Sequence, residues 1–161
     1  ETALRAFALA NIEEDIKIIL IGSGYHDQDY FAEIVAKIGL NDRVISVGHV
    51  EDSDLVDLYQ AADIYMDPSL YEGFGLQVLE AMSCGIPVLC SNTTSLPEIA
   101  GNVALTYKPN DIRGFADGIE YLMFNTSQMH LMRDAGILHA SKYSWNKTVE
   151  QLVSLCEHAI G

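Results

Sequence analysis

The chain has 161 residues, enough for one domain with a hydrophobic core, and nearly half of them are hydrophobic. Its net charge of −14 argues against nucleic acid as a partner and against direct contact with an anionic membrane. No apolar run approaches the roughly 18 residues that span a bilayer.

The first ten residues predict a helix with Leu4, Phe7 and Ala8 on one face. A native chain seldom starts inside an element, so we expect an excised domain whose first strand lies upstream of Glu1. Residues 1–161 form one domain in this interpretation, since no internal repeat and no linker rich in Gly, Pro or Ser is visible.

Short β-branched runs then alternate with helical patterns. Strands are expected at 15–21, 44–47, 63–66, 87–90 and 103–106. Helices are expected at 27–37 with Gly39 as its stop, from a cap at Asp52 or Ser53 to Ala61, at 75–84 with Gly85 as its stop, and at 111–124, 127–139 and 144–159. Between two of the strands, Ser95-Leu-Pro-Glu98 reads as a capping box.

This alternation predicts an α/β fold, a Rossmann-like doubly wound parallel sheet of about five strands with helices on both faces. In such sheets ligands bind beyond the carboxyl ends of the strands, so the loops after Ile21, Val47, Met66 and Cys90 should share one edge. A dinucleotide fingerprint fails, because Gly22-Ser-Gly24 has Asp27 where a third glycine would stand; we expect a tight turn there.

Asp67–Val88 is the most informative segment, with a strand end, a glycine-rich turn and the start of a short helix. Gly73 and Gly75 let the backbone approach a ligand, and the first helical turn offers free N–H groups to an anion. Glu72 precedes this turn and Glu80 follows it. Two carboxylates beside a phosphate site suit a ligand that also carries hydroxylated rings, such as a nucleotide sugar.

The segment resembles the signature of the retaining family-4 glycosyltransferases of the GT-B fold, in its Glu72-x7-Glu80 frame and in the surrounding P-S-x-x-E-G-F-G-L-x-x-L-E-A-M-x-C-G-x-P-V. Further likenesses run from Asp15 to Trp145, including Val47-Gly-His-Val50 and Ala61-Ala-Asp63. The resemblance implies the C-terminal, donor-binding half of an enzyme that transfers a sugar with retention. The acceptor site then belongs to the protein's own N-terminal domain.

The resemblance also implies roles for individual positions. Glu72, Gly73, Phe74 and Gly75 would contact the donor sugar, with Glu72 as a catalytic residue, while Leu76 and Gln77 would meet the diphosphate. Glu80 would hold the ribose, and Gly48, His49 and Val50 would line the base pocket. No metal is expected, and no cofactor other than the substrate, a UDP-, GDP- or ADP-sugar.

One feature of the charge distribution bears on this site. No Lys or Arg occurs between Arg43 and Lys108, so the site segment supplies no cation for a diphosphate. The resemblance places an Arg and a Lys on a loop upstream of Glu1. We therefore expect this chain alone to bind donor weakly and to turn nothing over.

Alternatives stay open from the sequence. The chain could belong to a nucleotide-sugar epimerase or to a non-catalytic domain that senses nucleotide sugars; a phospho-receiver is disfavoured because the strand ends lack its Lys. Glu72, Glu80 and His49 could be ordinary surface residues. Tyr143 and Trp145 are expected to pack the last helix, and Cys84, Cys90 and Cys156 to be buried reduced thiols of a cytoplasmic protein, with membrane association of the full-length enzyme left open.

Overall fold

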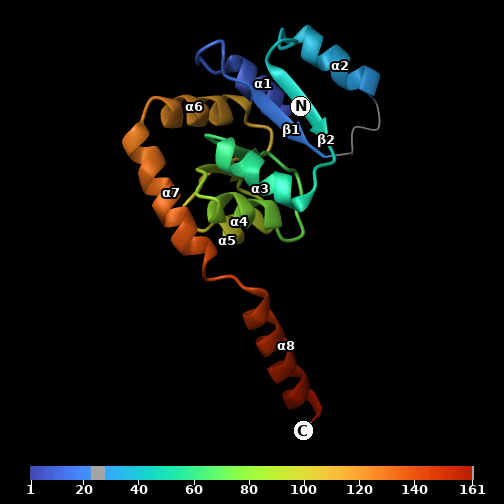
Figure 1. The fold of residues 1–161 in the computed structure, drawn as a ribbon, viewed down its shortest axis with the longest axis vertical. Coiled ribbons are helices and arrows are strands. Elements are labelled where there is room, and N and C mark those ends of the chain that lie inside the picture. Colours follow the sequence, from blue (N-terminus) through green and yellow to red (C-terminus); the bar gives the residue numbers. More distant parts are fainter. Residues whose placement is uncertain (23–27, 161) are drawn as a thin grey trace.

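The computed structural model describes residues 1–22 and 28–160 (Figure 1). Its strands are β1 (Ile18–Ile21), β2 (Val44–Gly48), β3 (Tyr65–Asp67), β4 (Val88–Ser91) and β5 (Leu105–Tyr107). Its helices are α1 (Thr2–Leu9), α2 (Gln28–Lys37), α3 (Asp52–Ala61), α4 (Leu76–Ser83), α5 (Leu96–Ala100), α6 (Ile112–Met123), α7 (Thr126–Ala140) and α8 (Trp145–Ile160). Every strand and helix predicted from the sequence is present.

All the ladders are parallel, which confirms the predicted α/β class. The strands form two hydrogen-bonded sheets, β1–β2 and β3–β4–β5, and no ladder joins them within the described part of the chain. Asp67 lies opposite Cys90 in the β3–β4 register, so the loops that follow these two strands leave from the same edge. This edge carries the segment that the sequence singled out.

Helices cover both faces of the larger sheet, and β4 separates two cores. Val88 and Cys90 of β4 pack into a core with α4 and α5, whereas Leu89 packs into a core with α6. This alternation follows from the two-residue period of a strand. A third core joins α1 and α2 to β1 and β2 and includes Leu4 and Phe7, as predicted, whereas Ala8, predicted on the same face, is exposed.

The predicted helix ends are partly correct. Gly39 and Gly85 follow α2 and α4 with φ of +74° and +77°, as expected of glycine stops. The predicted caps are wrong: α3 begins at Asp52 with neither Asp52 nor Ser53 capping it, and Ser95 makes no side-chain capping bond to α5. The hydroxyl of Ser95 donates instead to a distant main-chain carbonyl, described below.

Helix α8 extends away from the rest of the chain (Figure 1). Trp145 is therefore 74% exposed and Cys156 is exposed, so the prediction that Trp145 is packed and the prediction that Cys156 is buried are wrong.

Of the other two cysteines, Cys84 is partly buried and Cys90 is buried, and all three thiols are free. Burial, followed by the negative charge of Asp67, raises the pKa of the Cys90 thiol to about 12, which keeps it protonated. Among the described helices, none has the length and apolarity to cross a membrane.

Candidate functional site

The start of α4 forms the centre of the site. Gly75 precedes the helix in a left-handed conformation, with φ 94° and ψ 45°. A Cβ on Gly75 would lie 2.7 Å from Cδ2 of Leu96, which is fully buried, so only glycine fits without rearrangement. No side chain caps α4, and the N–H of Val78 already bonds to the carbonyl of Gly75. The N–H groups of Leu76 and Gln77 are thus available to an anion at the positive end of the helix.

The carboxylate of Glu72 lies just before this turn and is partly buried. Oγ of Ser69 is 3.2 Å from Oε1 of Glu72, and the same hydroxyl donates to Oδ1 of Asp67. Asp67 is 7% exposed at the end of β3 and also accepts from the Ser69 N–H at 3.1 Å. The Ser69 hydroxyl thus lies between the carboxylates of Asp67 and Glu72, and its single proton can serve only one of them at a time.

Glu80 has a partner that the sequence did not reveal. It is exposed on α4, and its Oε2 accepts a hydrogen bond of 3.3 Å from the Tyr59 hydroxyl of α3. Tyr59 is only 8% exposed, and burial followed by the charge of Glu80 raises its pKa far above the usual range. The phenol therefore remains a neutral donor that orients one carboxylate oxygen. Tyr59 occupies an ordinary apolar position in its helix pattern, so no local signal indicated this contact.

Replacing Tyr59 by Phe tests whether this bond orients Glu80. We expect nucleoside diphosphate binding to weaken about two- to tenfold, because one hydrogen bond contributes roughly 0.5–1.5 kcal/mol. Titration calorimetry measures the change. Tyr65→Phe is the matched control. Tyr65 packs against Tyr59 with ring centroids 5.8 Å apart, and removing its hydroxyl leaves the bond between Tyr59 and Glu80 in place. Equal effects of both variants would contradict the orienting role.

The loop predicted to line the base pocket borders a cavity of about 570 Å³. His49 and Val50 line it with Val47 and, from α3 and its N-terminus, Glu51, Asp54, Asp57, Leu58 and Ala61. His49 is exposed, and its Nε2 lies 3.7 Å from Oε1 of Glu51. Neither Glu72 nor Glu80 lines this cavity. Helix α3 connects the two parts, since it lines the cavity and carries Tyr59, the partner of Glu80.

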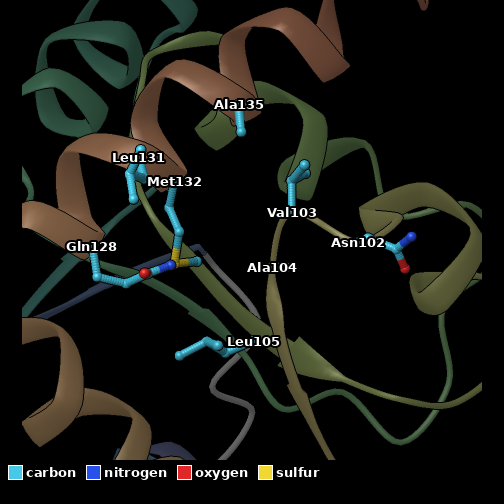
Figure 2. Close-up of a pocket in the computed structure, with 8 residues that line it drawn as sticks. All are labelled: Asn102, Val103, Ala104, Leu105, Gln128, Leu131, Met132 and Ala135. Atoms are coloured by element: carbon cyan, nitrogen blue, oxygen red, sulfur yellow. The ribbon is translucent and has the colours of Figure 1, made fainter.

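A second cavity, of about 190 Å³, lies away from the carboxyl edge of the sheet and is drawn in Figure 2. It is lined by Gln128, Leu131, Met132 and Ala135 of α7 and by residues 102–105, at the amino end of β5. None of the predicted site residues borders it. We therefore assign the candidate site to the carboxyl edge.

Other sequence predictions fall outside this cluster. Gly22 has a φ of +128°, but the remainder of the Gly22-Ser-Gly24 turn, like Asp27, lies outside the described residues. Glu98 is exposed in the first turn of α5. Within the described ranges, no three His, Cys, Asp or Glu side chains are grouped so that they could hold a metal ion.

Residues 1–155 match the family described as "Glycosyl transferases group 1", and the chain belongs to this family. It is 37% identical over 153 residues to O-antigen chain mannosyltransferase B of Escherichia coli, which covers 94% of this chain and 40% of that protein. It is 29% identical to the MMP alpha-(1->4)-mannosyltransferase of Mycolicibacterium hassiacum, over 98% of this chain and 39% of that protein. The chain thus spans about two fifths of these curated relatives.

Solved structures agree in fold. Sucrose-phosphate synthase from Thermosynechococcus elongatus superposes with a TM-score of 0.87 at 26% identity, over 99% of this chain and 41% of that one. Anabaena Alr3699/HepE in complex with UDP-glucose gives a TM-score of 0.83 at 24% identity, over 98% of this chain and 44% of that one. The fold is that of GT-B glycosyltransferases.

Proposed function

We propose that this chain binds the nucleotide-sugar donor in a glycosyltransferase that moves a hexose to an acceptor with retention at the anomeric carbon. One observation carries the proposal: the amides of Leu76 and Gln77 open α4, the carboxylate of Glu72 stands in the loop just before them, and the carboxylate of Glu80 follows further along the same helix. Amides at a helix start suit a diphosphate, and carboxylates beside them suit the hydroxyls of a sugar and a ribose. In this arrangement the chain contributes positioning and stabilisation of the leaving diphosphate.

The names of the relatives suggest which sugar to test first. Several are named mannosyltransferases, among them the two described above, so mannose is the first hexose to test. The proposal includes no cofactor, because the nucleotide sugar is itself the substrate. It assigns the acceptor, and a cation for the diphosphate, to the remainder of the full-length protein, since the site segment lacks Lys and Arg.

The experiment uses the full-length protein and matched donors: GDP-mannose, UDP-glucose and ADP-glucose with their nucleoside diphosphates. Ligand-observed NMR identifies the nucleotide that binds, and release of free nucleoside diphosphate is then followed with and without acceptor. We expect release to depend on acceptor. Interconversion of sugars without nucleotide release would instead identify an epimerase, and binding without turnover would identify a sensor.

A further inference from the structure

Three consecutive hydroxyl residues after β4 bond to the loop that carries Glu72. Oγ1 of Thr94 accepts a hydrogen bond of 3.1 Å from the N–H of Glu72, and Oγ of Ser95 donates at 2.9 Å to its carbonyl oxygen. Oγ1 of Thr93 donates at 3.2 Å to the carbonyl of Leu70. We refer to Thr93, Thr94 and Ser95 as the hydroxyl clamp. Both main-chain polar groups of Glu72 are therefore bonded by side chains about 22 residues further along the chain.

Apolar packing contributes little to fixing the conformation of this loop. Leu70 and Tyr71 are each 77% exposed, and Phe74 is 46% exposed, so the large apolar side chains beside Glu72 are not packed into a core. Loops without buried apolar contacts are the most mobile parts of a fold. Hydrogen bonds from the hydroxyl clamp therefore restrain the main chain of this loop, as apolar packing does in a buried segment.

The backbone of Thr94 is held in a strained conformation. Its φ is +55°, and among the described residues no other non-glycine residue has a positive φ. A β-branched residue is strained in this region, whereas glycine adopts it freely. The Thr94 hydroxyl is fully used, because Oγ1 also donates at 2.8 Å to the carbonyl of Thr93. Glycine would relieve the strain and lose the bond to Glu72.

The residue that follows the hydroxyl clamp lies against Gly75, at the other end of the Glu72–Gly75 turn. Ser95 is followed by Leu96, whose side chain closes the space where a Cβ on Gly75 would lie. One short segment therefore contacts both ends of Glu72–Gly75, the residues predicted to meet the donor sugar.

We propose that Thr94 and Ser95 are positioning residues that fix the main chain of Glu72 for contact with the donor sugar, an inference that rests on the sugar-binding role proposed above for Glu72. They would touch no substrate themselves. Their effect would fall on recognition of the sugar and leave recognition of the nucleotide unchanged.

The test compares the dissociation constants of a nucleoside diphosphate and its nucleotide sugar, GDP with GDP-mannose and UDP with UDP-glucose, in full-length variants. The ratio of the two constants measures what the sugar contributes. We expect Thr94→Gly to reduce this contribution about two- to tenfold, as the loss of one hydrogen bond implies, while diphosphate binding stays constant. The midpoint of thermal unfolding should stay constant or rise, because glycine relieves the strain. Thr94→Ser keeps the hydroxyl and should restore the sugar contribution.

Two comparisons separate the possible outcomes. Asn92→Gly, an exposed position in the same loop, is the matched control for added flexibility and should leave the ratio unchanged. In a Glu72→Ala background, Thr94→Gly and Ser95→Ala should cause no further loss, since they act through Glu72.

If Glu72→Ala abolishes the sugar contribution but Thr94→Gly and Ser95→Ala retain it, the clamp is refuted and the proposed function stands. If Thr94→Gly weakens the diphosphate and the nucleotide sugar equally, its role is structural and the inference also fails. If Glu72→Ala itself changes nothing, the proposed sugar site is wrong, and the inference falls with it.

Discussion

Replacing Glu72 by Ala in the full-length protein should lower kcat/KM for transfer about 10- to 150-fold. A hydrogen bond to a charged group contributes roughly 1.5–3 kcal/mol, and about 1.4 kcal/mol corresponds to a tenfold change in rate. The loss should appear in nucleotide-sugar binding and turnover and not in binding of the nucleoside diphosphate, because Glu72 is predicted to contact the sugar. Initial rates and calorimetric titrations with both ligands measure the two effects.

Glu33, exposed on α2 and remote from α4 in the sequence, provides the matched control. Glu33→Ala removes the same charge and should leave both ligands bound as before. Glu80→Ala should behave differently again and weaken the diphosphate and the nucleotide sugar together, because Glu80 is predicted to hold the ribose. Identical profiles for Glu72→Ala and Glu80→Ala would contradict the separate roles proposed for the two carboxylates.

Replacing Gly75 by Ala should destabilise the protein and also weaken donor binding. Alanine pays about 1–2 kcal/mol for the left-handed conformation, and its Cβ would lie 2.7 Å from the buried Leu96 side chain. We expect a total loss of about 1–3 kcal/mol in the free energy of unfolding. Relief of the clash would shift the amides of Leu76 and Gln77, so diphosphate binding should fall as well. Urea denaturation and calorimetry measure the two changes.

Gly73 supplies the control two residues earlier. It has no positive φ and no neighbouring atom within 4 Å of an added Cβ. Gly73→Ala should therefore leave the free energy of unfolding nearly unchanged, whatever its effect on the sugar. A stable Gly75→Ala variant that still binds diphosphate normally would show that the helix start is not the anion site.

The fold was predictable because its signals are local and repeated. Strand-length β-branched runs and helical periodicities mark each element, and the glycine-rich segment marks the start of α4. Contacts between distant residues left no such signal. Ser95 illustrates this, because its position fits a helix cap but its hydroxyl bonds to the carbonyl of Glu72. Sequence spacing does not show whether a serine hydroxyl accepts a bond from its own helix or donates one to a distant carbonyl.

Tertiary packing also decides the surroundings of Tyr59 and Trp145. Tyr59 reads as a core aromatic, and only the approach of α3 to α4 brings its hydroxyl to Glu80. Trp145 looks like a packing residue in the sequence, yet α8 lies apart from the other helices (Figure 1). The roles of Glu72, Glu80 and the 48–50 loop in binding a donor stay predictions, which the variants above address.

Strand β4 has a consequence for how this scaffold could accommodate different donors. All four of its residues are buried; the side chains of Val88 and Cys90 pack into one core and that of Leu89 packs into the other. A shift of one residue in the register of β4 would move each side chain to the opposite core, so packing fixes the position of this strand. In the proposed donor site, a change of ligand is therefore expected to arise in the loops at the carboxyl end of β4, because loops tolerate substitution better than a buried strand.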